Sequence, residues 1–226
     1  MCCFPYGDES ISWRGVHYRV SPCGSGFGEG SKNPRRHDVV GHGSIGREVA
    51  ERIFGSTSRV VVGKAATKTL FKQIASDYDY LHLATHGSLN RNVPSLSAIE
   101  LEPDKENDGR LELYEIVGMR LHARLVTLSA CETALGKGYF TETPSGDEFV
   151  GITRAFLSAG GQNVLASLWA VNDESTRALM VRFYRHLLTT NGAEALAKAQ
   201  QELRRSDVRY RHPYYWAPFV LVGSAN

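Results

Sequence analysis

Two stretches of sequence decide the fold: YLHLATHG at residues 80–87 and RLVTLSAC at residues 124–131. Each begins as a largely apolar run, which is typical of a strand that is covered on both faces of a sheet. Each ends at a residue that can do chemistry, His86 in the first stretch and Cys131 in the second. Because the carboxyl ends of neighbouring parallel strands meet at one edge of a sheet, we expect these two residues to lie close together in space.

The rest of the chain alternates between helical and extended patterns. Helical spacing is clearest at 174–188, where Leu179, Phe183 and Leu187 form one stripe. Helices are predicted at 47–54, 67–74 (with Thr67 as N-cap), 114–117, 146–159, 174–188 and 194–203, and strands at 59–62, 80–85, 98–101, 110–113, 124–129, 163–168 and 216–222. This order predicts one α/β domain of three layers, a mostly parallel sheet with helices on both faces.

Residues 1–44 differ from the remainder in composition. They contain SPCGSGFGEGSKNPRR (21–36), which is rich in Gly, Ser and Pro and lacks apolar periodicity. We therefore expect a loop-rich or disordered segment at 1–44 and the folded domain at 45–226. Three of the four cysteines fall within the first 23 residues, which is not the pattern of a disulfide framework, and we expect a reducing, cytoplasmic setting.

Charge and hydropathy exclude several classes of function. The chain has 26 Lys and Arg against 24 Asp and Glu, and this net charge of +2 argues against binding to nucleic acid or to a membrane surface. No apolar run reaches the roughly 18 residues that a membrane-spanning helix needs. His82 and His86 are four residues apart, but on a strand this spacing separates them by about 13 Å, so they cannot share a metal ion. We predict no metal site.

The chemistry of the His86 and Cys131 pair suits nucleophilic catalysis. A free thiol has a pKa of about 8.5 and needs a neighbouring base to become a nucleophile at neutral pH. A histidine can take that proton and later give one to a leaving amine. Gly87 lets a substrate approach the backbone, so the amides of Gly87 and Cys131 would form an oxyanion hole. The alternatives are a cysteine that serves only packing and a His-Gly turn without chemistry.

Four segments resemble the CHAT family, which belongs with the caspases and separases of clan CD: YLHLATHG (80–87), LVTLSACETALG (125–136), RAFLSAGGQNVLASLWAVND (154–173) and HPYYWAPFVLVG (212–223). The resemblance covers about residues 46 to 223, in the family's order and spacing. It implies a caspase-like fold and a cysteine endopeptidase that acts on a protein or peptide substrate without metal or organic cofactor. It assigns the catalytic roles to His86 and Cys131.

The resemblance also suggests where a substrate side chain would bind. Separases carry an acidic residue after a Trp-x-Val-x-Asp stretch, and it receives a basic P1 side chain. Here that stretch is Trp169 to Asp173, so Asp173 is the candidate S1 carboxylate and Trp169 a candidate pocket wall, with Asp147 and Glu148 as rival acids. Alternatively, Asp173 stabilises the start of a helix, where anions are favoured, and Trp169 is a core residue.

The sequence departs from the family near its start. A typical CHAT domain opens with a glycine-ended apolar strand, and here only DVV (38–40) corresponds to it. Family members often carry upstream TPR repeats, which this sequence lacks, so we expect a regulatory protein partner or a TPR region outside this chain. The alternative function is a non-catalytic regulatory or protein-interaction module on the same fold. A distance above about 7 Å between the Cys131 sulfur and the His86 ring would favour it.

Overall fold

The structure of the chain is a computed structural model. It describes residues 53–54, 58–88, 90, 92–129, 147–169 and 171–224, with the backbone alone at 147–149. Three sequence predictions therefore lie outside the described residues: the segment 1–44, most of the helix at 47–54, and Cys131 with the loop that follows it. The side chains of Asp147 and Glu148 lie outside them too.

Four strands form the central sheet in the order β1-β5-β6-β7. They are β1 (Tyr80–Leu83), β5 (Leu125–Leu128), β6 (Asn163–Ser167) and β7 (Phe219–Gly223). The first three pair in parallel, with Tyr80 opposite Leu125 and Val126 opposite Val164, and β7 pairs antiparallel to β6. The mostly parallel sheet predicted from the sequence is confirmed.

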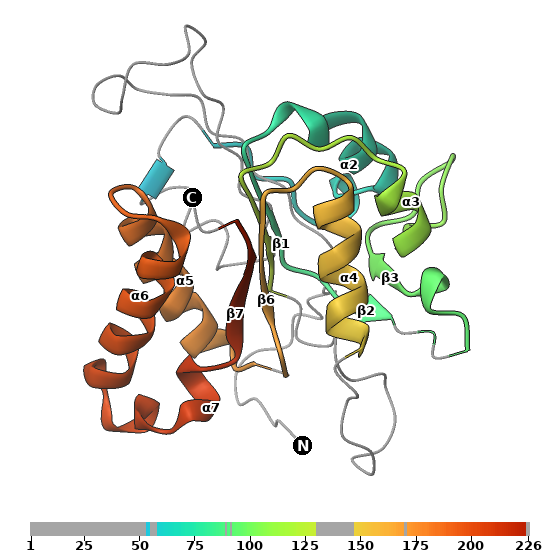
Figure 1. Cartoon of the computed structure of the whole chain (residues 1–226). Coiled ribbons are helices and arrows are strands. Elements are labelled where there is room, and N and C mark those ends of the chain that lie inside the picture. Colours follow the sequence, from blue (N-terminus) through green and yellow to red (C-terminus); the bar gives the residue numbers. More distant parts are fainter. Residues whose placement is uncertain are drawn as a thin grey trace, which may run out of the picture.

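Helices cover both faces of this sheet (Figure 1). On one face lie α5 (Asp173–Leu187) and α6 (Gly192–Ser206), and on the other lie α4 (Asp147–Ser158), α2 (Lys68–Ile74) and α3 (Leu113–Val117). Each face has its own apolar core, because alternate strand residues point to opposite sides. Leu81 and Leu83 pack with Phe156 on the α4 face, whereas Leu125 and Leu165 pack under α5. The three-layer, caspase-like α/β fold is thus confirmed.

A second, smaller sheet continues from the carboxyl end of β1. It consists of β2 (Gly87–Ser88), β3 (Ala98–Glu100) and β4 (Arg110–Glu112), all antiparallel, in the order β2-β3-β4. The remaining elements of the described chain are short: 3₁₀ turns at Gly63–Ala65, Ala75–Asp77, Pro94–Leu96 and Val208–Arg211, and the one-turn helix α7 (Pro213–Trp216). No helix within the described ranges is long and apolar enough to cross a membrane.

Two predicted strands differ from the structure for identifiable reasons. The predicted strand at 59–62 is wrong, because only Val61 makes a bridge there and Gly63, with φ of 56°, turns the chain into a 3₁₀ turn. The predicted strand at 216–222 begins instead at Phe219. Pro213 occupies the first turn of α7, where its fixed φ suits a helix start, so residues 213–216 are helical.

Helix starts follow the expected capping chemistry. The Thr67 hydroxyl accepts a hydrogen bond from the Leu70 amide at 3.2 Å, which confirms it as the N-cap of α2. Asn172 and Asn191 cap α5 and α6 through their side-chain oxygens. These caps fix where each helix begins, and α5 therefore starts at Asp173, after a short connection from β6.

Candidate active site

The structure brings together the two strands that lead to His86 and Cys131. β1 and β5 lie side by side and run in the same direction, so their carboxyl ends share one edge of the sheet (Figure 1). Pairing continues past the strand ends, because the Ser129 amide donates to the Leu83 carbonyl at 3.0 Å. Ser129 stands two residues before Cys131, and Leu83 stands three before His86. The segments leading to both residues therefore start from adjacent points on this edge.

The second sheet holds the backbone around His86. The His86 carbonyl accepts a hydrogen bond from the Glu100 amide at 2.8 Å, and the Thr85 hydroxyl donates to the Glu100 carbonyl. Gly87 is paired with Ile99 of β3. The His86 side chain is half-buried. His86 thus sits on backbone that β3 holds on both sides, at the carboxyl edge of the sheet.

A buried polar network lies between the sheet and α5, just below this edge. His82 Nε2 lies 2.6 Å from the Ser129 hydroxyl, and His82 Nδ1 lies 3.3 Å from the Tyr184 hydroxyl, which in turn donates to Thr127 Oγ1 at 2.8 Å. His82, Thr127 and Tyr184 are completely inaccessible to solvent, and Ser129 is 6% exposed. The network therefore joins β1, β5 and α5 through side chains in the interior.

Burial fixes the protonation of this network. Loss of hydration lowers the pKa of His82 to about 3 and raises the pKa of Tyr184 above its ordinary value, so both groups are neutral at pH 7. Because Tyr184 donates its proton to Thr127, its oxygen is left to accept from His82 Nδ1–H. His82 Nε2 is then the acceptor for the Ser129 hydroxyl. One tautomer of His82 satisfies all three contacts.

Sequence reasoning missed this network, since it considered His82 only as a metal ligand. The signal was present: a histidine in the middle of the largely apolar run YLHLAT must find a partner when it is buried. The register explains which partner it finds. His82 is directly opposite Thr127, and both residues face the side of the sheet that α5 covers, where Tyr184 lies on the packed stripe of that helix.

The S1 candidates occupy different positions around the carboxyl end of β6. Asp173 is the first residue of α5, and it lies in the first turn while Asn172 is the N-cap. Trp169 Nε1 donates to the Tyr214 carbonyl at 3.3 Å, which ties the segment after β6 to α7. Asp147 is the first residue of α4. The structure thus brings Trp169 against α7, and it places Asp173 four residues further along the same strand exit.

Metal-binding geometry is missing from the described part of the chain. Within those ranges, no group of three or more His, Cys, Asp or Glu residues is arranged to hold a metal ion.

The fold and this strand edge define a caspase-like α/β domain, and comparison with known proteins gives the family. The model of the CHAT domain matches residues 44–224, so the chain belongs to the CHAT family, a caspase-like family of clan CD. It is similar to tetratricopeptide repeat protein 28 of Mus musculus, with 28% identity over 204 residues, and to that of Homo sapiens, with 27% identity over 202 residues. These matches cover 73% of this chain but only 8% of either relative's length.

Proposed function

We propose that this domain is a cysteine endopeptidase in which His86 and Cys131 form the catalytic pair. The observation that carries the proposal is the parallel pairing of β1 with β5, extended by the hydrogen bond from Ser129 to Leu83. It brings the two chain segments that end in His86 and Cys131 to one edge of the sheet. In α/β folds this carboxyl edge is where active sites form.

Each residue then has a distinct role in hydrolysis. His86 accepts the proton of the Cys131 thiol, and the thiolate attacks the scissile carbonyl carbon to form a tetrahedral intermediate. The amides of Gly87 and Cys131 stabilise the negative oxygen. His86 then protonates the leaving amine, which leaves a thioester on Cys131. Water, deprotonated by His86, hydrolyses that thioester and releases the acid product. These reaction steps require neither a metal ion nor an organic cofactor.

A basic P1 side chain is the specificity that the site supports best. Asp173 stands at the exit of β6, the strand next to β5, where its carboxylate can pair with Arg or Lys. Trp169 supplies a flat wall on the same strand exit. Asp147, at the start of α4, is the rival carboxylate. A single neutralising substitution at each position separates the two assignments.

The relatives suggest the setting in which the domain works. Both are named as tetratricopeptide repeat proteins, and their matching region is a small part of a much longer chain. We infer that this domain also acts beside a helical-repeat region, in its own chain or in a regulatory partner, and that it does so in the cytoplasm. Its substrate is a protein or peptide.

The test is hydrolysis of a panel of fluorogenic peptides that vary at P1. We expect cleavage after Arg or Lys, loss of activity in Cys131→Ala, and a decrease of roughly 10²- to 10⁴-fold in His86→Ala. Cys23→Ala is the matched control, because it removes a thiol from outside the predicted domain and should leave activity unchanged. Activity that survives Cys131→Ala would refute the proposal. A folded chain that cleaves no peptide and leaves Cys131 unmodified would instead indicate the non-catalytic interaction module.

A further inference from the structure

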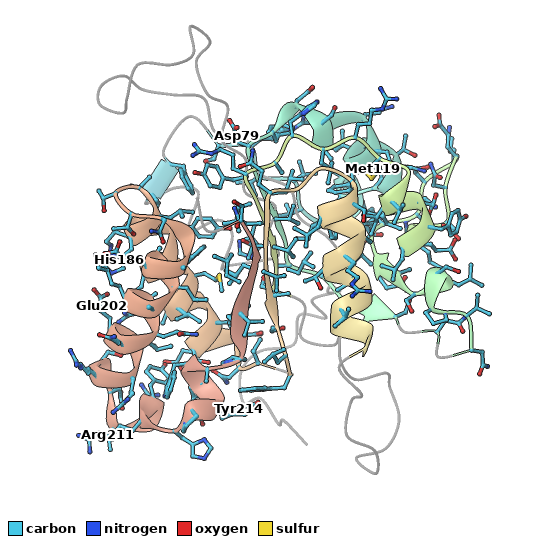
Figure 2. All side chains as sticks on the ribbon, in the orientation of Figure 1. Asp79, Met119, His186, Glu202, Arg211 and Tyr214 are labelled. Atoms are coloured by element: carbon cyan, nitrogen blue, oxygen red, sulfur yellow. The ribbon has the colours of Figure 1, made fainter. Side chains whose placement is uncertain are left out.

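A groove of about 1040 Å³ lies along the helical layer formed by α5 and α6. On α5 its lining residues recur at helical spacing, from Glu174 to His186, and on α6 they run from Lys198 to Ser206. Figure 2 labels His186 and Glu202 in this layer, where the two side chains meet across the helix pair at 2.8 Å. Leu179 and Phe183 of α5 pack in the core beneath the sheet and do not line the groove, whereas Val181 and Tyr210 belong to the edge of that core and also form the groove floor.

The groove has a strong excess of positive charge. Five of its lining residues are Arg or Lys and two are Glu, which is an excess of three positive charges. The entire chain has an excess of only two. The residues that line the groove therefore carry more excess positive charge than the chain as a whole. The five cations are Arg177, Arg182, Arg185, Lys198 and Arg205.

Internal ion pairs neutralise only part of this charge. Glu202 contacts both His186 at 2.8 Å and Arg182 at 3.9 Å. Lys198 pairs with Glu194 at 2.7 Å. By contrast, Arg185 and Arg205 are exposed and line the groove, and among the described residues neither has a carboxylate within ion-pair distance. Two guanidinium groups, one on each helix, are thus available to an anionic ligand.

We propose that this groove binds an acidic segment of a partner protein, whose carboxylates pair with Arg185 and Arg205. The planar guanidinium fork matches a carboxylate in a bidentate arrangement. Ala178, Val181 and Tyr210 also line the groove, so apolar side chains of the segment find contacts between the charges. The stretch of α5 along the groove, from Glu174 to His186, spans 13 residues, or about 20 Å, which suits a short helical or extended peptide.

A second hollow extends the same surface toward α7. It has a volume of about 490 Å³, shares Arg205 with the groove, and is lined further by Arg204, Arg211, Pro213 and Trp216. Arg204 stacks over the Trp216 ring at 5.9 Å. Trp169, which follows β6, donates a hydrogen bond to the Tyr214 carbonyl of α7. An acidic segment that follows this surface therefore ends beside the carboxyl edge of the sheet.

The same features argue against nucleic acid as the ligand. Phosphodiester binding relies on a dense positive surface that acts on many phosphates. Here the groove presents two exposed guanidinium groups, those of Arg185 and Arg205, which suits a few carboxylates better than a continuous run of phosphates.

The experiment measures direct binding and does not depend on peptidase activity. The full chain is titrated into a fluorescein-labelled peptide of twelve residues, six Glu interleaved with Ala and Leu, and anisotropy is recorded at low salt. We expect saturable binding that weakens as salt is raised, because exposed charge pairs are screened. The double variant R185E/R205E should weaken binding by roughly tenfold or more, since it replaces two attractions by two repulsions.

The matched control is R120E/R154E, which makes the same change in net charge. Both residues are exposed, and they follow α3 and lie on α4, on the opposite face of the sheet. This control should keep at least half of the wild-type affinity for the acidic peptide. Thermal unfolding followed by circular dichroism verifies that both variants fold. Three outcomes would overturn the proposal: no saturation below about 1 mM, equal loss in both variants, or tighter binding of a twelve-residue oligothymidylate at the same groove.

Discussion

The buried histidine of the strand-edge network makes the domain sensitive to acid. His82 is wholly buried between the Ser129 and Tyr184 hydroxyls, and its pKa is lowered to about 3, against 6.5 for the free side chain. The unfolded chain therefore binds a proton between these two values, whereas the folded chain does not. Stability from this site is fully present above pH 6.5 and is lost progressively as the pH falls toward 3.

The magnitude follows from the width of that window. One pKa unit corresponds to about 1.4 kcal/mol, so His82 lowers the free energy of unfolding by about 2 kcal/mol between pH 7.5 and pH 5. His82→Gln keeps a hydrogen-bonding side chain but removes the titration. At pH 7.5 it should destabilise the fold by about 1–3 kcal/mol, because the Ser129 and Tyr184 hydroxyls lose well-aligned partners. Between pH 7.5 and 5 it should then lose about 2 kcal/mol less than wild type does.

Urea unfolding followed by circular dichroism at several pH values measures this difference. The control is His122→Gln, since His122 is exposed and the same substitution there should leave the pH dependence as it is in wild type. If His82→Gln has the same pH dependence as wild type, the burial of a neutral histidine is not what destabilises the domain in acid, and the account of the network is wrong.

Three further predictions concern packing, backbone and specificity. Tyr184→Phe should lower the free energy of unfolding by about 1–3 kcal/mol, because it leaves buried Thr127 and His82 atoms without the hydroxyl between them. A loss below about 0.5 kcal/mol would contradict this prediction. Gly160→Ala should lower the free energy of unfolding by about 1–3 kcal/mol, because Gly160 has φ of 107° and a Cβ would collide with a backbone carbonyl oxygen. The control Gly151→Ala, within α4, should leave the stability unchanged or raise it. Equal effects of the two substitutions would refute this reasoning. Asp173→Asn should lower kcat/KM for Arg and Lys at P1 by roughly 10- to 150-fold and spare neutral P1 residues; the same result from Asp147→Asn instead would reassign the pocket.

The sequence allows the architecture to be predicted because the decisive patterns are strong. Apolar runs at 80–85 and 124–129 became β1 and β5, and the stripe through Leu179 and Phe183 became the packed face of α5. The errors arose where one residue overrides a local pattern. Gly63 ends the β-branched run at 59–62, and Pro213 starts a helical turn within a stretch rich in aromatic residues.

The candidate site was predictable only in part, because its parts depend on different kinds of information. The position of His86 at a strand end follows from pattern alone. The contact of His82 with Tyr184 joins residues 102 positions apart, so only the tertiary packing of α5 on β1 reveals it. The basic groove is of the same kind, since the cations of α5 and α6 are unremarkable in sequence and gather only when the two helices pair.

The central claim, that Cys131 is a nucleophile activated by His86, is tested most directly by covalent labelling. The full chain is treated with a peptidyl acyloxymethyl ketone that carries Arg at P1, and the modified residue is identified by mass spectrometry. The account predicts one label per chain, on Cys131, that is greatly slowed in His86→Ala and unchanged in Cys23→Ala. Labelling that falls on Cys2, Cys3 or Cys23 instead, or labelling of Cys131 at an equal rate without His86, would contradict it.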